Sequence, residues 1–92
     1  MDKRQQLDLM DKVQRELDDL KNSQTSVLKK VSQIAAHNIT LGVELLDSKL
    51  PDLEDQVNAS LTATSELSEA FAEYRTKFFS DNNLAASADP TK

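Results

Sequence analysis

The chain has 92 residues and a formal net charge of −5, with 38% hydrophobic, 29% charged and 4% aromatic residues. Its single glycine and its lack of cysteine exclude glycine-rich phosphate loops, disulfide frameworks and thiolate-based metal or catalytic sites. The acidic balance disfavours nucleic acid as a partner, because phosphates require a basic face. A chain of this length holds one hydrophobic core and, as a compact monomer, is only marginally stable.

A heptad ladder organises the first half of the chain. Its apolar residues recur in alternating steps of three and four, a period that predicts a coiled-coil helix. The ladder consists of Met10, Val13, Leu17, Leu20, Gln24, Val27, Val31, Ile34, Asn38, Leu41 and Leu45. We interpret its polar members, Gln24 and Asn38, as register-setting residues, because a polar core residue lowers stability but penalises wrong registers. On this interpretation, replacing Asn38 with leucine raises thermal stability.

Residues 21–26 have low helix propensity and are rich in helix-capping residue types. A break there gives a three-helix bundle with helices at about 3–21, 25–47 and 51–80. The heptad ladder keeps its phase through this stretch, which favours one continuous helix instead.

A second ladder, displaced in register from the first, begins near residue 50. It consists of Leu50, Leu53, Val57, Ser60, Thr64, Leu67, Phe71, Tyr74 and Phe78. Pro51 lies at the break. A proline in the interior of a helix lowers its stability by about 3 kcal/mol, but a proline in the first turn does not. Asp47 and Ser48 are candidate N-caps just before it. We therefore expect an all-α fold, an antiparallel coiled-coil hairpin with helices at about 3–47 and 51–80; a kinked, extended parallel coiled coil remains the alternative.

In an antiparallel hairpin the sequence numbers of two facing residues add up to a constant. For a turn centred near Lys49 this sum is about 98. This register pairs Gln24 with Tyr74 and Asn38 with Ser60. Both pairs are polar, and pairing them avoids leaving a buried amide unsatisfied, at a cost of about 1–3 kcal/mol. We expect these four residues to form the register-setting polar core.

The same register leaves residues 1–17 beyond the end of the second helix. Apolar residues in this overhang, and others that widen the face of the first helix, exceed what a two-helix hairpin can bury. We therefore predict a partner interface at Leu7, Leu9, Met10, Val13, Leu17, Leu28, Ala35, Ile39, Val43 and Leu46. The helical domain is expected to span residues 1–80, and residues 81–92, which lack periodicity, are expected to form a disordered tail.

We expect no catalytic, cofactor or metal site and no small-molecule substrate. His37 is the only histidine, which is too few for a triad or a histidine-based metal site, and Glu66, Glu69 and Glu73 are expected to form a solvated acidic ridge. No apolar run is long enough to span a bilayer, and the N-terminal stretch does not resemble a signal peptide. We expect a soluble chain, in the cytoplasm or within a large assembly.

The leading functional hypothesis is a non-catalytic coiled-coil assembly or scaffold subunit. It would bind by helix–helix packing, to itself or to other helical proteins. A second hypothesis is a small helical chaperone or adaptor whose overhang fills a groove of its client. A third is a trimeric fibre or stalk, as on virus particles, with the chain extended. Length separates these, because a hairpin measures roughly 65–70 Å and an extended rod more than about 110 Å.

Overall fold

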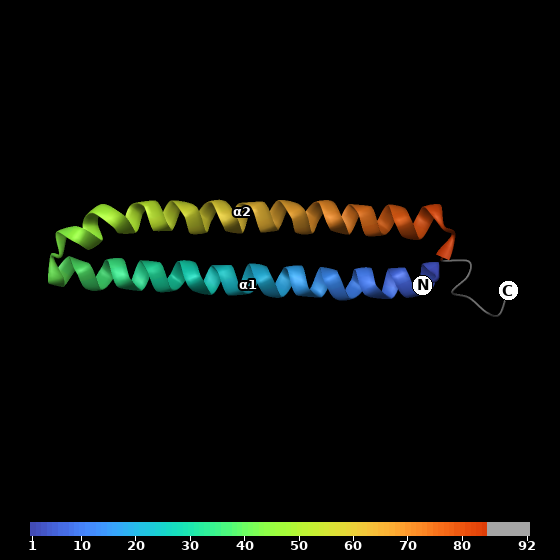
Figure 1. Ribbon diagram of the computed structural model, residues 1–92, viewed down its shortest axis with the longest axis horizontal. Coiled ribbons are helices and arrows are strands. Elements are labelled where there is room, and N and C mark those ends of the chain that lie inside the picture. Colours follow the sequence, from blue (N-terminus) through green and yellow to red (C-terminus); the bar gives the residue numbers. More distant parts are fainter. Residues whose placement is uncertain (85–92) are drawn as a thin grey trace.

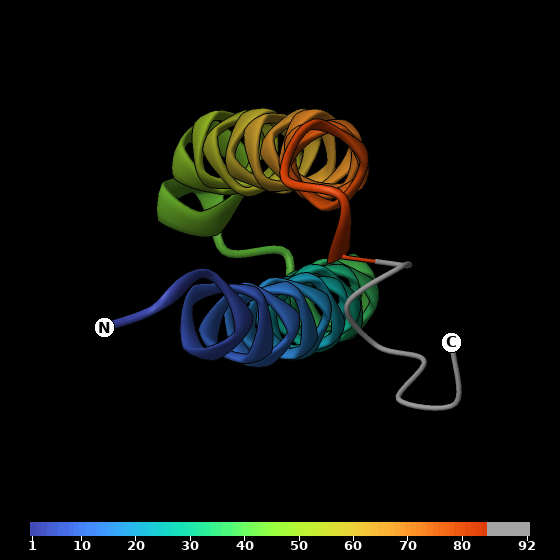
Figure 2. The same ribbon diagram turned by 90° about the vertical axis from the view of Figure 1, so that its right-hand side faces the viewer.

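The computed structural model describes residues 1–84, which form two long antiparallel helices, α1 (Lys3–Leu41) and α2 (Glu44–Asp81) (Figure 1). The molecule measures 69 × 19 × 17 Å, the length expected of a hairpin and not of an extended rod. An end-on view shows the two helices lying one above the other, with a short connection between them (Figure 2). The predicted all-α helical hairpin is therefore confirmed.

α1 begins at a capping box and continues without a break. The Asp2 carboxylate accepts a hydrogen bond from the Gln5 backbone N–H (2.8 Å), and the Asp2 N–H donates to the Gln5 side chain (3.0 Å). Within residues 21–26, the hydroxyls of Thr25 and Ser26 each donate to a backbone carbonyl four residues earlier, so both residues remain helical. The break required for a three-helix bundle is absent from α1.

The chain reverses direction at Gly42 and Val43, not near Pro51. Gly42 has φ +67° and ψ 34°, a left-handed conformation that glycine adopts without a steric penalty, and its N–H donates to the Asn38 carbonyl at 2.7 Å. This C-cap ends α1 at Leu41. The predicted helix boundaries at 47 and 51 are therefore wrong, because the chain's one glycine, and not its internal proline, marks the turn.

Asn38 holds the turn together through its buried side chain. Its amide oxygen accepts a hydrogen bond from the Val43 N–H (2.8 Å). Its amide nitrogen donates to the Val43 carbonyl (3.1 Å) and to the Asp47 carboxylate (2.7 Å). The predicted pairing of Asn38 with Ser60 is wrong, because Asn38 satisfies its hydrogen bonds within the connection.

Pro51 lies inside α2, about two turns after its first residue. Proline has no N–H to donate to the Asp47 carbonyl, and its ring crowds the preceding turn, which bends a helix. The first turns of α2 are tilted relative to the rest of the helix (Figure 1). The helix is thus continuous through Pro51, as the kinked-helix alternative expected, although the chain as a whole folds back.

The two helices pair along their whole length. Because α1 has 39 residues and α2 has 38, neither extends far beyond the other, and the predicted overhang of residues 1–17 is wrong (Figure 1). Side-chain hydrogen bonds between the helices join Gln14 to Ser68, Gln24 to Ser60 and Asp11 to Arg75. The residue numbers in these pairs add up to 82, 84 and 86, well below the value predicted from a turn near Lys49.

The sum of facing residue numbers is lower in the observed register than in the predicted one by about two heptads. Registers that differ by whole heptads bring the same ladder positions together, so the heptad pattern could not distinguish them. The predicted pairing of Gln24 with Tyr74 is also wrong: the Gln24 amide donates to the Ser60 hydroxyl at 2.7 Å, and the Tyr74 side chain is exposed.

α2 ends at Asp81, and the next residues return toward the start of α1. The Arg4 guanidinium donates to the carbonyl of Leu84 at 2.7 Å, and the Leu84 side chain is buried. The predicted tail therefore begins too early, because Leu84 contacts α1. The remainder of that tail, residues 85–92, lies outside the described residues.

We expect Asn38→Leu to lower the free energy of unfolding by about 2 kcal/mol, because it leaves the Val43 N–H without its acceptor and the Asp47 carboxylate without the Asn38 amide donor. This is the opposite of the effect expected from the sequence. Urea unfolding followed by far-UV circular dichroism measures it, with Gln33→Leu on an exposed part of α1 as the control. An unfolding midpoint equal to or above that of the wild type would contradict the role assigned to Asn38.

We expect Gly42→Ala to lower the free energy of unfolding by about 1 kcal/mol, because an L-residue is strained at positive φ. No atom lies within 4 Å of the position that an added Cβ would occupy, so the effect comes from the backbone and not from a clash. Gly42→Asn should cost less, since asparagine tolerates the left-handed conformation better. Equal losses for both substitutions in the same urea titration would argue against this explanation.

Candidate functional site

The contact between α1 and α2 has two edges, and one of them is polar. We call it the polar edge and define it by Asp11, Gln14, Asp18, Ser68 and Arg75. The Arg75 Nε and Nη2 donate to the two carboxylate oxygens of Asp11 at 2.7 and 3.3 Å. The Gln14 amide donates to the Ser68 hydroxyl at 2.8 Å, and this hydroxyl donates to Asp18 at 3.4 Å. These bonds fix the register of the two helices.

The ion pair on the polar edge changes the acidity of both of its members. The hydrogen bond from Arg75 holds the pKa of Asp11 below its ordinary value of 3.8, although partial desolvation opposes this effect. The same hydrogen bond raises the pKa of Arg75. Because the two side chains keep about a third of their surface exposed, at 33% and 37%, solvent screens the pair and limits its contribution to stability.

The opposite edge carries a long stripe of apolar side chains, which we call the apolar face. Its members recur at heptad spacing along each helix, so they share one side of that helix. All of them are exposed except Val13, which is half-buried. The apolar face consists of Val13, Leu20, Val27, Ile34 and Leu41 of α1 and of Leu53, Leu67 and Tyr74 of α2.

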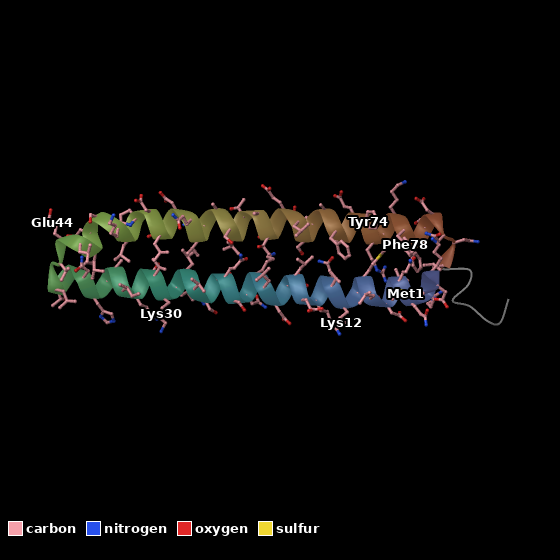
Figure 3. The ribbon with its side chains drawn as sticks, in the orientation of Figure 1. Met1, Lys12, Lys30, Glu44, Tyr74 and Phe78 are labelled. Carbon is pink, nitrogen blue, oxygen red and sulfur yellow. The ribbon has the colours of Figure 1, made fainter. Side chains whose placement is uncertain are left out.

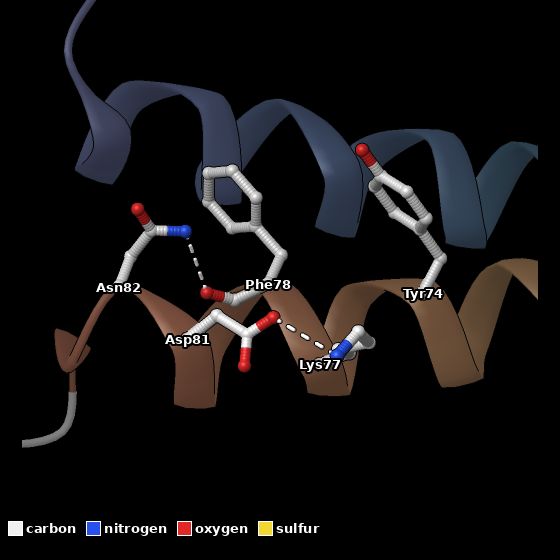
Figure 4. Close-up of a pocket in the computed structure, with 5 residues that line it drawn as sticks. All are labelled: Tyr74, Lys77, Phe78, Asp81 and Asn82. Atoms are coloured by element: carbon white, nitrogen blue, oxygen red, sulfur yellow. Dashed lines mark hydrogen bonds and ion pairs between the residues drawn. The ribbon is translucent and has the colours of Figure 1, made fainter.

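The contributions of the two helices lie on the same side of the hairpin. Near the free ends of the helices, Val13 and Met10 of α1 line one hollow together with Tyr74 and Phe78 of α2. Tyr74 and Phe78 extend from α2 toward α1 in a close-up of this end (Figure 4). Heptad spacing from Val13 and Tyr74 then carries the apolar face along the hairpin. The stripe therefore runs along both helices, with one polar interruption on α2 at Ser60.

The hairpin alone buries little apolar surface. Side chains fill the space between the helices (Figure 3), but within residues 1–84 the buried hydrophobic side chains are Leu7, Val31 and Leu84 alone. By contrast, Leu67 is 56% exposed and Val27 is 50% exposed, both in the apolar face. Removing apolar surface from water contributes about 25 cal/mol per Å² to stability. Burial of the exposed stripe would therefore add stability that the hairpin alone does not have.

The ten predicted interface residues are distributed over several parts of the hairpin. Leu7 is 3% exposed, and it occupies the same heptad position as Gln14, so it belongs to the contact with α2. Leu28 and Ala35 share that heptad position and are half-buried. Ile39 is 86% exposed and lies next to the buried Asn38, away from the apolar face. Met10, Val13 and Leu17 are half-buried, Leu9 is exposed beside Met10 and Val13, and Val43 and Leu46 lie at the turn.

Most residues of the apolar face are not among the residues predicted to form an interface. The ladder residues Leu20, Val27 and Ile34 were assigned to the core of the hairpin, but their side chains are exposed. The signal that could have found them is their spacing: they form the second stripe of the ladder, next to the stripe that contains Leu17 and Val31. The pattern indicates both stripes, but it does not show which of them packs against the other helix of the same chain.

The candidate residues for chemistry lie at the surface of the hairpin. His37 and the glutamates Glu66, Glu69 and Glu73 are exposed. Among residues 1–84, no three acidic or histidine side chains are grouped so that they could hold a metal ion. In the same part of the chain, neither helix is both long and apolar enough to cross a membrane.

Comparison with protein-family models, with curated proteins and with solved structures gives no match to this chain. Its function has to be inferred from the hairpin and its surfaces.

We expect Asp11→Asn to lower the free energy of unfolding at neutral pH by about 0.5 kcal/mol, the range of a partly exposed ion pair. Since the folded chain lowers the pKa of Asp11 below 3.8, the stabilisation is present above that value and is lost as the pH falls through the folded-state pKa. Urea titrations of both proteins over the acid range should therefore converge at low pH. A difference that stays constant across the range would show that charge on Asp11 is not its cause.

Proposed function

We propose that this protein is a non-catalytic subunit that assembles by helix–helix packing through the apolar face, with a copy of itself or with another helical protein. The observation that carries the proposal is the largely exposed apolar stripe on both helices, which runs from Val13 to Leu41 on α1 and, interrupted at Ser60, from Leu53 to Tyr74 on α2. Large exposed apolar patches on a folded chain are typical of interaction sites.

The spacing of the stripe favours a helical partner. Residues that recur every seven positions along two adjacent helices present regular ridges and holes, into which the side chains of another helix can pack. On the polar edge at the other side of the contact, Asp11, Arg75 and the Gln14 amide nitrogen take part in hydrogen bonds, whereas the Gln14 amide oxygen is buried without a partner in the described chain. The hairpin is thus two-sided, with one face suited to association and the other edge to contact with water.

The other two functional hypotheses lose the features on which they depended. The adaptor hypothesis used an overhanging end of α1 to fill a groove of a client, and α1 and α2 are nearly equal in length. The trimeric fibre used a fully extended chain, whereas the helices fold back into a hairpin. No observation favours either of them over assembly through the apolar face.

We expect the double substitution Leu20→Glu and Leu67→Glu to weaken association at least about 100-fold while helix content remains, because it places charges in a contact that excludes water. The matched control is Ile39→Glu with Ala59→Glu, which adds the same charge at exposed positions outside the apolar face. Sedimentation velocity measures association, and far-UV circular dichroism measures helix content. Equal weakening in both variants would point to charge in general and not to the apolar face.

A partner other than the chain itself is detected by a photo-crosslinking amino acid placed at Val27 and, as the control, at Ile39, in cells that express the protein. A position in the interface is expected to crosslink to protein more strongly than the exposed control position. A chain that is monomeric at about 100 µM and that crosslinks no more at Val27 than at Ile39 would contradict the proposed function.

A further inference from the structure

We infer that the occupant of the apolar face is a second copy of the chain, packed face to face with its turn at the opposite end. In this four-helix bundle α1 lies antiparallel to α1 of the second copy, and α2 lies antiparallel to α2. The inference rests on the proposed function and names the partner. A two-fold dimer is the commonest symmetric assembly of soluble proteins, and it requires a surface that complements itself.

The apolar face meets this requirement in both helices at once. A two-fold axis near Ser23 of α1 brings Val13 opposite Ile34 of the second copy and Leu20 opposite Val27. A two-fold axis near Ala63 of α2 brings Leu53 opposite Tyr74, and it brings Leu67 opposite the small polar side chain of Ser60. The two positions lie at one level of the hairpin, because the neighbouring residues Gln24 and Ser60 are joined by a hydrogen bond. One axis therefore serves both helices.

Charges beside the apolar face distinguish the two symmetric arrangements. With the turns at opposite ends, Glu16 faces Lys30 of the second copy, and symmetry forms this pair twice. Both residues are exposed, and neither takes part in an ion pair within residues 1–84. With the turns at the same end, Glu16 would face Ala70 and Lys30 would face Gln56, which gives no ion pair. The charges favour the arrangement with the turns at opposite ends.

The residues around the proposed axis permit a close approach. Ser23 and Ala63 would each meet their own counterpart, and both are small, so the helix axes can lie near the short end of the usual range of about 8–10 Å. One pairing is unfavourable, Lys49 opposite Lys77 near the ends of the bundle. Lys77 already has an opposite charge beside it, since its ammonium group lies 3.2 Å from the Asp81 carboxylate.

A polar layer lies near the proposed axis. The hydrogen-bonded pair of Gln24 and Ser60 is the polar interruption on the side of the contact that carries the apolar face. The Gln24 amide oxygen is buried and has no hydrogen-bond partner within the described chain. In the proposed register Gln24 lies beside its own counterpart across the axis, whereas Ser60 faces Leu67 of the second copy.

The available area is sufficient for a stable dimer. The hairpin measures 69 × 19 × 17 Å, so one of its long sides has a footprint of about 1,000 Å², and stable interfaces bury roughly 800 Å² on each partner. The apolar face and the half-buried stripe beside it make up most of the width of this footprint.

Single-cysteine variants test the geometry, because the chain has no cysteine of its own. Ser23→Cys and Ala63→Cys place the thiols beside the two-fold axis, and each is expected to form a disulfide-linked dimer under mild oxidation. Lys30→Cys is the control: its two copies would lie about 20 Å apart, too far for a disulfide. Non-reducing gels of the dimer fraction measure the yield.

A charge exchange tests the ion pairs. Glu16→Lys or Lys30→Glu alone is expected to weaken the dimer about tenfold, since two attractive pairs become repulsive, and the double variant should return to within about twofold of the wild type. Glu66→Lys, an exposed residue outside the apolar face, is the control and should leave the dissociation constant unchanged. Sedimentation equilibrium measures the dissociation constant of each variant.

Two results would overturn the inference. Disulfides that form only when Ser23→Cys and Ala63→Cys chains are mixed would mean that the turns lie at the same end. A wild-type chain that is monomeric at about 100 µM would exclude a second copy as the occupant. Neither result removes the proposed function, which is decided separately by crosslinking at Val27 against Ile39.

Discussion

The structure depends on how much surface two packed helices can cover. Each helix of a hairpin hides only the stripe that faces its neighbour, and in this chain that contact buries few apolar side chains, Leu7 and Val31 among them. The heptad pattern is wider than this contact, because a second apolar stripe runs beside the first. The excess of apolar surface is a property of the sequence, and it becomes one face of the hairpin because both helices present it on the same side.

The two edges of the helix contact have different roles. The polar edge, with the Asp11–Arg75 pair and the hydrogen bonds of Gln14, sets the alignment of the helices and needs no other molecule. The apolar face adds little to the contact between the helices and is exposed to solvent. If the hairpin assembles as proposed, its register is already set before it meets a partner.

The helical class and the hairpin topology could be predicted from the sequence, but the position of the turn could not. Heptad repeats are periodic, so moving the turn by one heptad leaves every core position matched with another core position. Only local chemistry could locate the turn, and both Gly42 and Pro51 were candidates for it. The predicted turn lies near Pro51, but α2 accommodates this proline by bending, and Gly42 supplies the positive φ that ends α1. The pairing of Asn38 with Ser60 looked favourable only because both are polar, and the turn satisfies Asn38 locally. The candidate site was missed for the same reason: heptad stripes indicate which residues seek burial and not which neighbour buries them.

The sparse burial inside the hairpin has a consequence for the protein in a cell. Within residues 1–84 the hairpin's own contacts hide few apolar side chains, and sparse burial favours local opening, which exposes a chain to proteases and chaperones. Association of the kind proposed would suppress such opening by mass action. Under that proposal, copies without a partner would be cleared faster than assembled ones, and the abundance of the protein would follow the supply of whatever covers its apolar face.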